Sequence, residues 1–421
     1  MLIGAVLAAQ FPLAPAGAQV LSLEEALTLT LERSPRAIAL RRRLVVSEAG
    51  VLTAGAVPNP SLTVGDADLV GREAKATFLF FEQPFELGGK RDARLTLADA
   101  GVALARAEIA ESLWQLRSEV RKAHTELSVA RADLGALTEV AASGERLVQV
   151  AEQRLRLGDI PELDLIRARQ ELAALRNEVR AGRARVVVAE VALGGLIARP
   201  PEEPIEVPPA SQFALKVQTD SFLPPDPNDA AVRSDRLRRL IDQALARRPQ
   251  LRVLDAQLGV ASAEKRLAEA ERAPDLTLGL GPRFEREEAD RLGVAARVAL
   301  TLPLWYRQEG QIARAEAQGG QLAAERDALA RQVIAEVQSS YARILAAREQ
   351  IDAFEETLLP GAREVEQISR LAYERGKSDL TVSINAQTAG ILTRQRYHRA
   401  VLDYQVALAD LERAVGAPLT I

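Results

Sequence analysis

The chain has 421 residues, a formal net charge of −4, 4% aromatic residues and no cysteine. Without cysteine it cannot form disulfides, thiolate metal sites or thiol nucleophiles, and it cannot be lipidated on an N-terminal cysteine. Arginines and carboxylates are interleaved along predicted helix faces, so no nucleic-acid partner is expected. Because only two histidines are present, we expect no metal site and interpret His124 and His398 as helix-face residues.

Residues 1–18 are apolar and end in Ala16-Gly17-Ala18, the small-x-small pattern of a cleavage site. They predict a secretory signal peptide, although the usual positive residues after Met1 are absent. A true start upstream of Met1 and a disordered apolar tail are the alternatives. No later run reaches the length of a transmembrane helix, about 18 apolar residues, so any membrane crossing would have to use strands.

A helix is predicted from Ser22, which suits an N-cap, to about Gly55, with an interruption at Ser34-Pro35. Two extended runs follow, at about 61–69 and 76–87.

A long helix is then predicted from about Arg91 to Leu157. Its apolar residues recur at alternating steps of three and four, which indicates a coiled-coil seam. Gly158 and Pro161 end it in a tight turn, because glycine can adopt the positive φ of a helix C-cap and proline suits the next first turn. A returning helix is predicted from there to about Ala198.

Residues 199–234 are rich in proline and predict an extended linker. The pattern of the first half then recurs, with an offset of roughly 214–219 residues between corresponding positions. We therefore divide the chain into a first repeat at 22–198, a second repeat at 235–416 and a short tail at 417–421.

The second repeat has its own strands, at about 275–285 and 292–304. In the latter, apolar residues alternate with small or polar ones, as in a membrane barrel, and Arg297 lies on the side that would face the lumen. An edge hairpin in a soluble domain is the alternative. Aromatic residues in the first repeat's run at 76–87 and directly after the run at 292–304 are expected at the membrane interface. They are Phe78, Phe80, Phe81, Trp305 and Tyr306.

Four strands cannot close a barrel alone, and an open edge is not tolerated in lipid. A cyclic oligomer would solve this, and three chains would supply twelve strands. The long helix of each repeat has roughly 67 residues, or about 100 Å, and the two short helices add up to a similar length. We therefore predict a mainly α fold with a small β part, in which the duplicated units form a cylinder of helices.

The turn at Gly158, the corresponding turn at Gly376 in the second repeat, and the helices that flank them resemble the TolC family of outer-membrane efflux channels. The matching segments are Ala151–Ala168 and Leu359–Gln387, and the ending Ala407–Gly416 matches as well. The resemblance covers roughly residues 22–416. Residues 83–91, QPFELGGKR, resemble the subgroup that serves heavy-metal resistance pumps of the cobalt–zinc–cadmium type.

This resemblance implies a homotrimer in the outer membrane, with a trimeric α-helical barrel topped by a shared 12-stranded transmembrane β-barrel. It would be a passive exit duct, without catalysis or cofactor, for cargo such as heavy-metal cations. The implied partners are a periplasmic adaptor protein and an inner-membrane pump of the resistance-nodulation-division type. The adaptor would dock on the tips, at Leu157, Gly158, Arg375 and Gly376.

The resemblance also implies a latch at the tunnel entrance. Asp164 and Tyr373 match positions that hold family members closed, and a hydrogen bond between them, worth about 1.5–3 kcal/mol for a charged acceptor, would suit a latch opened by a partner. The alternatives are a helix-dipole role for Asp164 and seam packing for Tyr373. Some members carry acidic residues where this chain has Val382 and Asn385, so Asn385 would form a neutral polar constriction.

Two other function classes are possible. A periplasmic coiled-coil scaffold or adaptor would keep the hairpins, but it would not need alternating strands with aromatic edges. An enzyme is not expected, because the sequence has no glycine-rich phosphate loop, metal-ligand cluster or nucleophile elbow.

Overall fold

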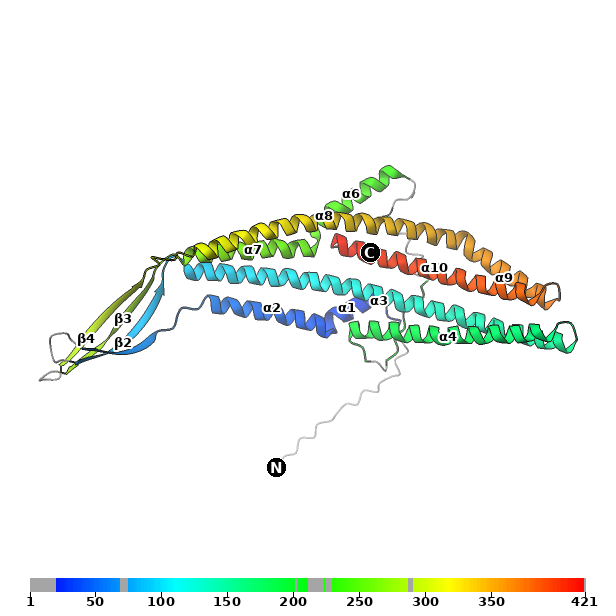
Figure 1. The fold of residues 1–421 in the computed structure, drawn as a ribbon, viewed down its shortest axis with the longest axis horizontal. Helices are drawn as coiled ribbons and strands as arrows, with labels where there is room; N and C mark the ends of the chain where they lie inside the picture. The colour runs from blue at the N-terminus through cyan, green and yellow to red at the C-terminus, as the bar shows by residue number, and fades with distance from the viewer. Residues whose placement is uncertain are drawn as a thin grey trace, which may run out of the picture. The chain divides into compact units, whose positions relative to one another are not determined.

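A computed structural model describes residues 20–68, 75–200, 203–210, 223, 229–286 and 291–419 (Figure 1). The expected signal peptide and much of the expected linker lie outside these residues. The chain divides into two compact units, each containing parts of both sequence repeats. The tip unit comprises Met1–Ile38, Gln115–Gln243 and Ala335–Ile421, and the sheet unit comprises Ala39–Trp114 and Ala244–Ile334.

The described helices of the first repeat begin and end close to the predicted residues. Ser22 caps the first of them: its Oγ accepts a hydrogen bond from the Glu25 amide at 3.2 Å, and Glu25 Oε2 accepts one from the Ser22 amide at 2.9 Å. The third has 67 residues, in agreement with the heptad pattern. The helices are α1 Leu23–Arg33, α2 Pro35–Ala54, α3 Lys90–Arg156 and α4 Glu162–Ile197.

The second repeat differs in its long helix, which contains a π-helical turn at Phe354–Leu358. There the Leu359 amide bonds to the Phe354 carbonyl, and Pro360, which has no amide hydrogen, removes an α-helical bond just beyond. The helices are α6 Ala230–Arg247, α7 Pro249–Ala270, α8 Glu309–Ala353, α9 Leu359–Glu374 and α10 Leu380–Val415. No helix in the described part of the chain is long and apolar enough to cross a membrane.

The strands form one antiparallel sheet in the order β1-β2-β3-β4. They are β1 Ser61–Asp68, β2 Lys75–Glu86, β3 Asp275–Arg286 and β4 Arg291–Thr301. Because β2 pairs with β3, the hairpins of the two repeats lie side by side (Figure 1). β4 ends earlier than expected, before Pro303, which cannot donate to a ladder. Among the described strands, β1 and β4 each have one neighbour and leave an edge unpaired.

The strand register separates two faces of the sheet. Ser61, Glu82, Gly279 and Arg297 form one row across the four strands, and directly opposed residues share a face. We call this the polar face. The opposite, apolar face exposes large side chains that include Leu62, Val64, Phe81, Leu280, Val294 and Val298. An exposed apolar surface of this kind indicates contact with lipid or with a partner.

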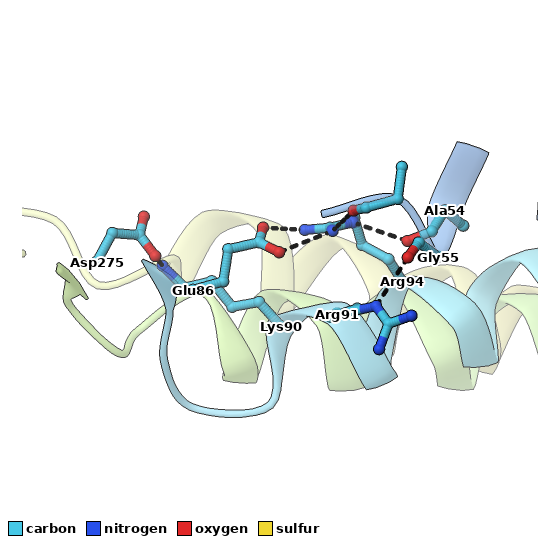
Figure 2. A network of polar contacts seen from close by, with 8 residues as sticks. Ala54, Gly55, Glu86, Lys90, Arg91, Arg94 and Asp275 are labelled. Carbon is cyan, nitrogen blue, oxygen red and sulfur yellow. Dashed lines mark hydrogen bonds and ion pairs between the residues drawn. The ribbon is translucent and has the colours of Figure 1, made fainter. Parts of the chain in front are cut away.

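Charged side chains join the sheet to the helices at the start of α3 (Figure 2). Arg94 forms an ion pair with Glu86, the last residue of β2, and its Nε donates to the Ala54 carbonyl at 3.3 Å. Arg91 Nε donates to the Gly55 carbonyl at 2.7 Å. The two arginines thus satisfy free carbonyls at the end of α2 and favour its dipole.

The same joint includes the start of β3. Lys90 Nζ donates to Asp275 Oδ1 at 2.7 Å (Figure 2). Between β2 and α3, Gly88 and Gly89 have φ of +73° and +74°, which glycine adopts freely. The segment at 83–91 therefore builds the joint between strands and helices.

In the tip unit, part of the expected linker packs into the helical core. Ile205 is 2% exposed, and its amide donates to Glu190 Oε1 at 2.6 Å. His124 of α3 belongs to the same region and is fully buried, with its Nε2 2.9 Å from the Leu21 carbonyl. Burial lowers the pKa of His124 below its usual range, so the ring is neutral and Nε2 donates this bond.

Candidate functional site

The two tips have the same backbone geometry. Gly158 and Gly376 have φ of +78° and +70°, a conformation that other residues rarely adopt. The Gly158 amide donates to the Leu155 carbonyl at 3.0 Å, and the next amide, of Asp159, donates to the Arg154 carbonyl at 2.9 Å. These two bonds define a Schellman motif, which satisfies the last carbonyls of α3.

The second tip repeats both bonds. The Gly376 amide donates to the Tyr373 carbonyl at 3.0 Å, and the Lys377 amide to the Ala372 carbonyl at 2.8 Å. Each lies about 218 residues after its counterpart, so the duplication extends to individual hydrogen bonds.

The tips present different side chains. Leu157 of the first tip is 76% exposed, and Leu163 at the start of α4 is 53% exposed. The second tip exposes Arg375 and Lys377 instead. A partner that contacts both tips would therefore meet an apolar protrusion on one and positive charge on the other.

Beneath the tips, Tyr373 of α9 belongs to a core that both hairpins share. Its side chain is 1% exposed and lies in one cluster with Ala151 of α3, Leu165 of α4 and Leu380 of α10. Tyr373 therefore packs in the seam between the helices, which was the alternative interpretation of this residue.

The expected hydrogen bond between Asp164 and Tyr373 is not formed. In the part of the chain that is described, the Tyr373 hydroxyl has no hydrogen-bond partner, and Asp164 lies 3.8 Å from Arg167 in the same helix. Arg154 of α3 makes the contact instead. Its guanidinium lies 5.0 Å from the centre of the Tyr373 ring, and its Nη1 donates to the Tyr373 carbonyl at 3.2 Å.

The Tyr373 hydroxyl stays protonated, because burial raises its pKa. Asp164 lies in the first turn of α4, where a carboxylate favours the helix dipole. The cation–π contact of Arg154 therefore replaces the expected Asp–Tyr bond as the link between the two hairpins.

Asn385 and Val382 are both exposed on α10, and the entrance role of Asn385 stays a prediction. Gln387, on the neighbouring turn, makes the buried polar contact of this stretch. Its Nε2 donates to Ser143 Oγ of α3 at 3.1 Å.

These contacts belong to a ladder between α3 and the helices α9 and α10. Four α3 residues of the ladder, at positions 122, 133, 143 and 154, recur every 10 or 11 positions, and three helical turns take about 10.8 residues, so these four lie on one face of α3. Arg121, next to Lys122, adds a fifth rung. From the tip inward, the rungs are Arg154–Tyr373 carbonyl at 3.2 Å, Ser143–Gln387 at 3.1 Å, Asp133–His398 at 2.5 Å, Lys122–Asp410 at 2.8 Å and Arg121–Glu412 at 3.2 Å.

On the sheet, Arg297 lies on the polar face and is part of a polar row. Arg297 Nη1 lies 3.2 Å from Glu82 Oε1, and Thr63 Oγ1 donates to Glu82 Oε2 at 2.7 Å. The Arg297–Glu82 pair reaches over Gly279, where a Cβ would lie 3.0 Å from Glu82 Cγ. Glycine thus leaves room for a charge pair across an intervening strand.

The register corrects the position expected for two aromatic residues. Phe78 is opposite Arg283, and Phe78 and Phe80 alternate with the apolar-face residues Leu79 and Phe81. Phe78 and Phe80 therefore lie on the polar face with Glu82 and not on the apolar face with Phe81. The mixed aromatic spacing of β2 left its faces ambiguous until strand pairing was known.

Phe81 lies on the apolar face, and Trp305 and Tyr306 follow β4 with 94% and 52% of their surface exposed. Their place at a membrane interface stays a prediction. In the described residues, no group of three or more His, Cys, Asp or Glu side chains could hold a metal ion.

Sequence reasoning missed Arg154 and Gln387 as contact residues. Arg154 lies in the last turn of α3, where a cation suits any helix C-terminus, so its position alone gave no functional signal. Gln387 lies inside the segment that resembles the TolC family, which was the available hint.

The fold matches solved outer-membrane channels over almost its whole length. CusC, a protein that forms a transmembrane channel, matches with a TM-score of 0.74 and 16% identity, over 94% of this chain and 92% of that one. The outer-membrane channel OprN matches with a TM-score of 0.73 and 18% identity, over 95% and 91%. The fold is that of this class of outer-membrane channel.

The sequence gives the family. The profile of the family described as "Outer membrane efflux protein" matches residues 26–199 and 240–417, and the chain belongs to this family. It is 28% identical over 414 residues to the cobalt-zinc-cadmium resistance protein CzcC of Cupriavidus metallidurans, covering 96% of this chain and 92% of that protein. The protein is an efflux channel of the outer membrane, in a family of transport channels and not of enzymes.

Proposed function

We propose that three copies of the chain form one channel, with a shared twelve-stranded barrel in the outer membrane and a helical tunnel in the periplasm. The observation that carries this proposal is the sheet. Its four described strands leave the outer edges of β1 and β4 unpaired, and its exposed apolar face is opposite a polar one. Unpaired edges are not tolerated in lipid, so β1 and β4 need partners from other copies. Residues 1–18 would act as the signal that directs the chain across the inner membrane.

The mass of the particle extracted from purified outer membranes in mild detergent tests the trimer. We expect a particle of about three chains, because closed cyclic assembly removes every strand edge. A monomer confined to the soluble fraction would contradict the shared barrel and favour the periplasmic scaffold.

The tips are the proposed docking site for a periplasmic adaptor, which would connect the channel to an inner-membrane pump of the resistance-nodulation-division type. Support comes from their matched backbone geometry and their exposure, with Leu157 and Leu163 on one tip and Arg375 and Lys377 on the other. The channel itself would be passive, so the pump would supply the energy.

Heavy-metal cations are the proposed cargo. The support is the 28% identity with CzcC, a cobalt-zinc-cadmium resistance protein, over nearly the whole chain. The segment at 83–91 adds no support by itself, because its residues build the joint between sheet and helices.

The proposed latch is the Arg154–Tyr373 contact, the rung of the ladder nearest the tips. If the hairpin of α9 and α10 swings away from α3 during opening, this rung breaks first. Asp164 and Asn385 would line the entrance without carrying the latch.

Replacing Arg154 by alanine should shift the channel toward its open state. A partly desolvated cation–π contact is worth about 1–2 kcal/mol, so the ratio of closed to open channels should fall by a factor of about 5–30. The measurement is conductance in planar lipid bilayers. Arg156→Ala is the matched control, because Arg156 is exposed in the same helical turn. Equal conductance of the two variants would remove Arg154 from the latch.

A further inference from the structure

The polar face of the sheet carries an aromatic cluster at one end. Phe78 and Phe80 stack with their ring centres 5.6 Å apart and their planes 7° from parallel. The Arg283 guanidinium lies 5.6 Å from the centre of the Phe78 ring, and an Arg283–Glu285 ion pair of 3.0 Å holds it there. We call these four residues the aromatic cluster.

The side chains of the cluster are ordered by their neighbours. Phe78 and Phe80 are half-buried, whereas Phe81 on the apolar face is 56% exposed. The cluster is also balanced in charge, because Glu285 neutralises Arg283. It therefore presents phenyl rings and not a net charge.

The cluster lies where β2 begins and β3 ends, at the end of the sheet away from the start of α3. The other polar-face pair, Glu82–Arg297, lies closer to the helices along the same strands. If the helices lie in the periplasm, the cluster lies near the outer mouth of the barrel.

We propose that Phe78 and Phe80, held by Arg283, form an aromatic constriction near the outer mouth that limits the size of solutes passing through the barrel. This inference rests on the proposed trimer, in which rotational symmetry brings the three copies of the cluster to one height in the lumen. Phenyl rings that project into a water-filled pore narrow it and exclude solutes wider than the opening. A passive duct gains from such a filter, because the outer mouth faces the external medium continuously.

The test compares two sets of variants on opposite faces of one strand. Phe78→Thr combined with Phe80→Thr removes both rings and keeps a good strand former, and each single variant serves as a smaller step. Phe81→Thr is the matched control on the apolar face. Detergent-extracted particle mass checks that each variant assembles.

The readout is the polymer size limit measured in planar bilayers, with polyethylene glycols added on the barrel side of channels inserted in one orientation. All channels in the comparison also carry Arg154→Ala, so that closed tips do not limit the current and the readout reports the outer mouth. The double variant should admit larger polymers, and its conductance should rise by about twofold or more, an order-of-magnitude expectation for opening a constriction. The single variants should shift less, and Phe81→Thr should match the wild type.

Two results would overturn the inference while leaving the channel intact. One is a wild-type channel whose polymer limit and conductance equal those of the double variant. The other is a shift caused by Phe81→Thr and not by the double variant, which would place the lumen on the other face. A wild type that forms no trimer and no channel would overturn the proposed function itself, and the constriction with it.

Discussion

Efflux should be lost when Gly376 is replaced by valine, while the trimer still assembles. Gly376 has a φ of +70°, and a left-handed conformation is strongly disfavoured for a β-branched residue. A Cβ at this position meets only the end of the Arg154 side chain, at 3.5 Å, so the loss would come from a changed tip backbone and not from a clash in the core. Gly158→Val should act in the same way, because Gly158 has a φ of +78°. No atom lies within 4 Å of its Cβ position, so here too the loss would come from the backbone.

Asparagine provides the matched control at both tips, since it tolerates the left-handed region. Gly158→Asn and Gly376→Asn should therefore retain efflux. The measurement is growth on zinc, cobalt and cadmium salts of cells that carry the channel with its adaptor and pump, together with cross-linking of the adaptor to the tips. Normal cross-linking in the valine variants would show that the tip backbone is not the docking element.

A strain that lacks the channel but grows normally on all three salts would reject heavy metals as cargo.

Outer-membrane assembly should fail in Gly88→Ala. Gly88 combines a φ of +73° with a very close neighbour, because a Cβ there would lie 2.2 Å from the Ala273 Cβ. Gly89 has almost the same φ, +74°, but no atom lies within 4 Å of its Cβ position. Gly89→Ala should therefore cost only the backbone strain, about 1–2 kcal/mol, and should still assemble.

A second substitution isolates the cause. Removing the Ala273 Cβ with Ala273→Gly should restore assembly to Gly88→Ala in large part, because the 2.2 Å clash would be gone. The backbone strain and a tight 3.2 Å approach to the Ala270 carbonyl oxygen would remain. The measurement is the amount of trimer in purified outer membranes. Full assembly of Gly88→Ala alone would show that the joint between β2 and α3 is not tightly packed. Failure of the rescue would move the cause to another contact of Gly88.

Most of the helical framework follows from the sequence, because its determinants are local. The Ser22 cap, the break at Pro35 and the turn at Gly158 each depend on residues within one or two helical turns. The π-helical turn before Pro360 is different, since proline alone does not show whether a helix ends, kinks or changes its hydrogen bonds.

The contacts that define the candidate site were harder to predict, because they join residues far apart in the sequence. Arg154 meets Tyr373 through the packing of two hairpins, and nothing near Arg154 distinguishes it from an ordinary helix-terminal cation. The faces of β2 were ambiguous for a related reason. Its aromatic residues occupy both even-numbered and odd-numbered positions and so point to both faces of the strand. Only pairing with β1 and β3 shows which face is polar, with Phe78 on it and Phe81 on the opposite face.

The pairing of β2 with β3 has a consequence for how such a channel can arise. This strand pair joins the last strand of one repeat to the first strand of the next inside a single chain. In the proposed trimer, β4 of one chain would meet β1 of its neighbour in the same way. Each chain is then a covalently fused dimer, and the ring has pseudo-sixfold order built from six equivalent hairpins. Once the repeats are fused, each can diverge without the other, so the apolar Leu157 tip and the basic Arg375 tip alternate around the ring.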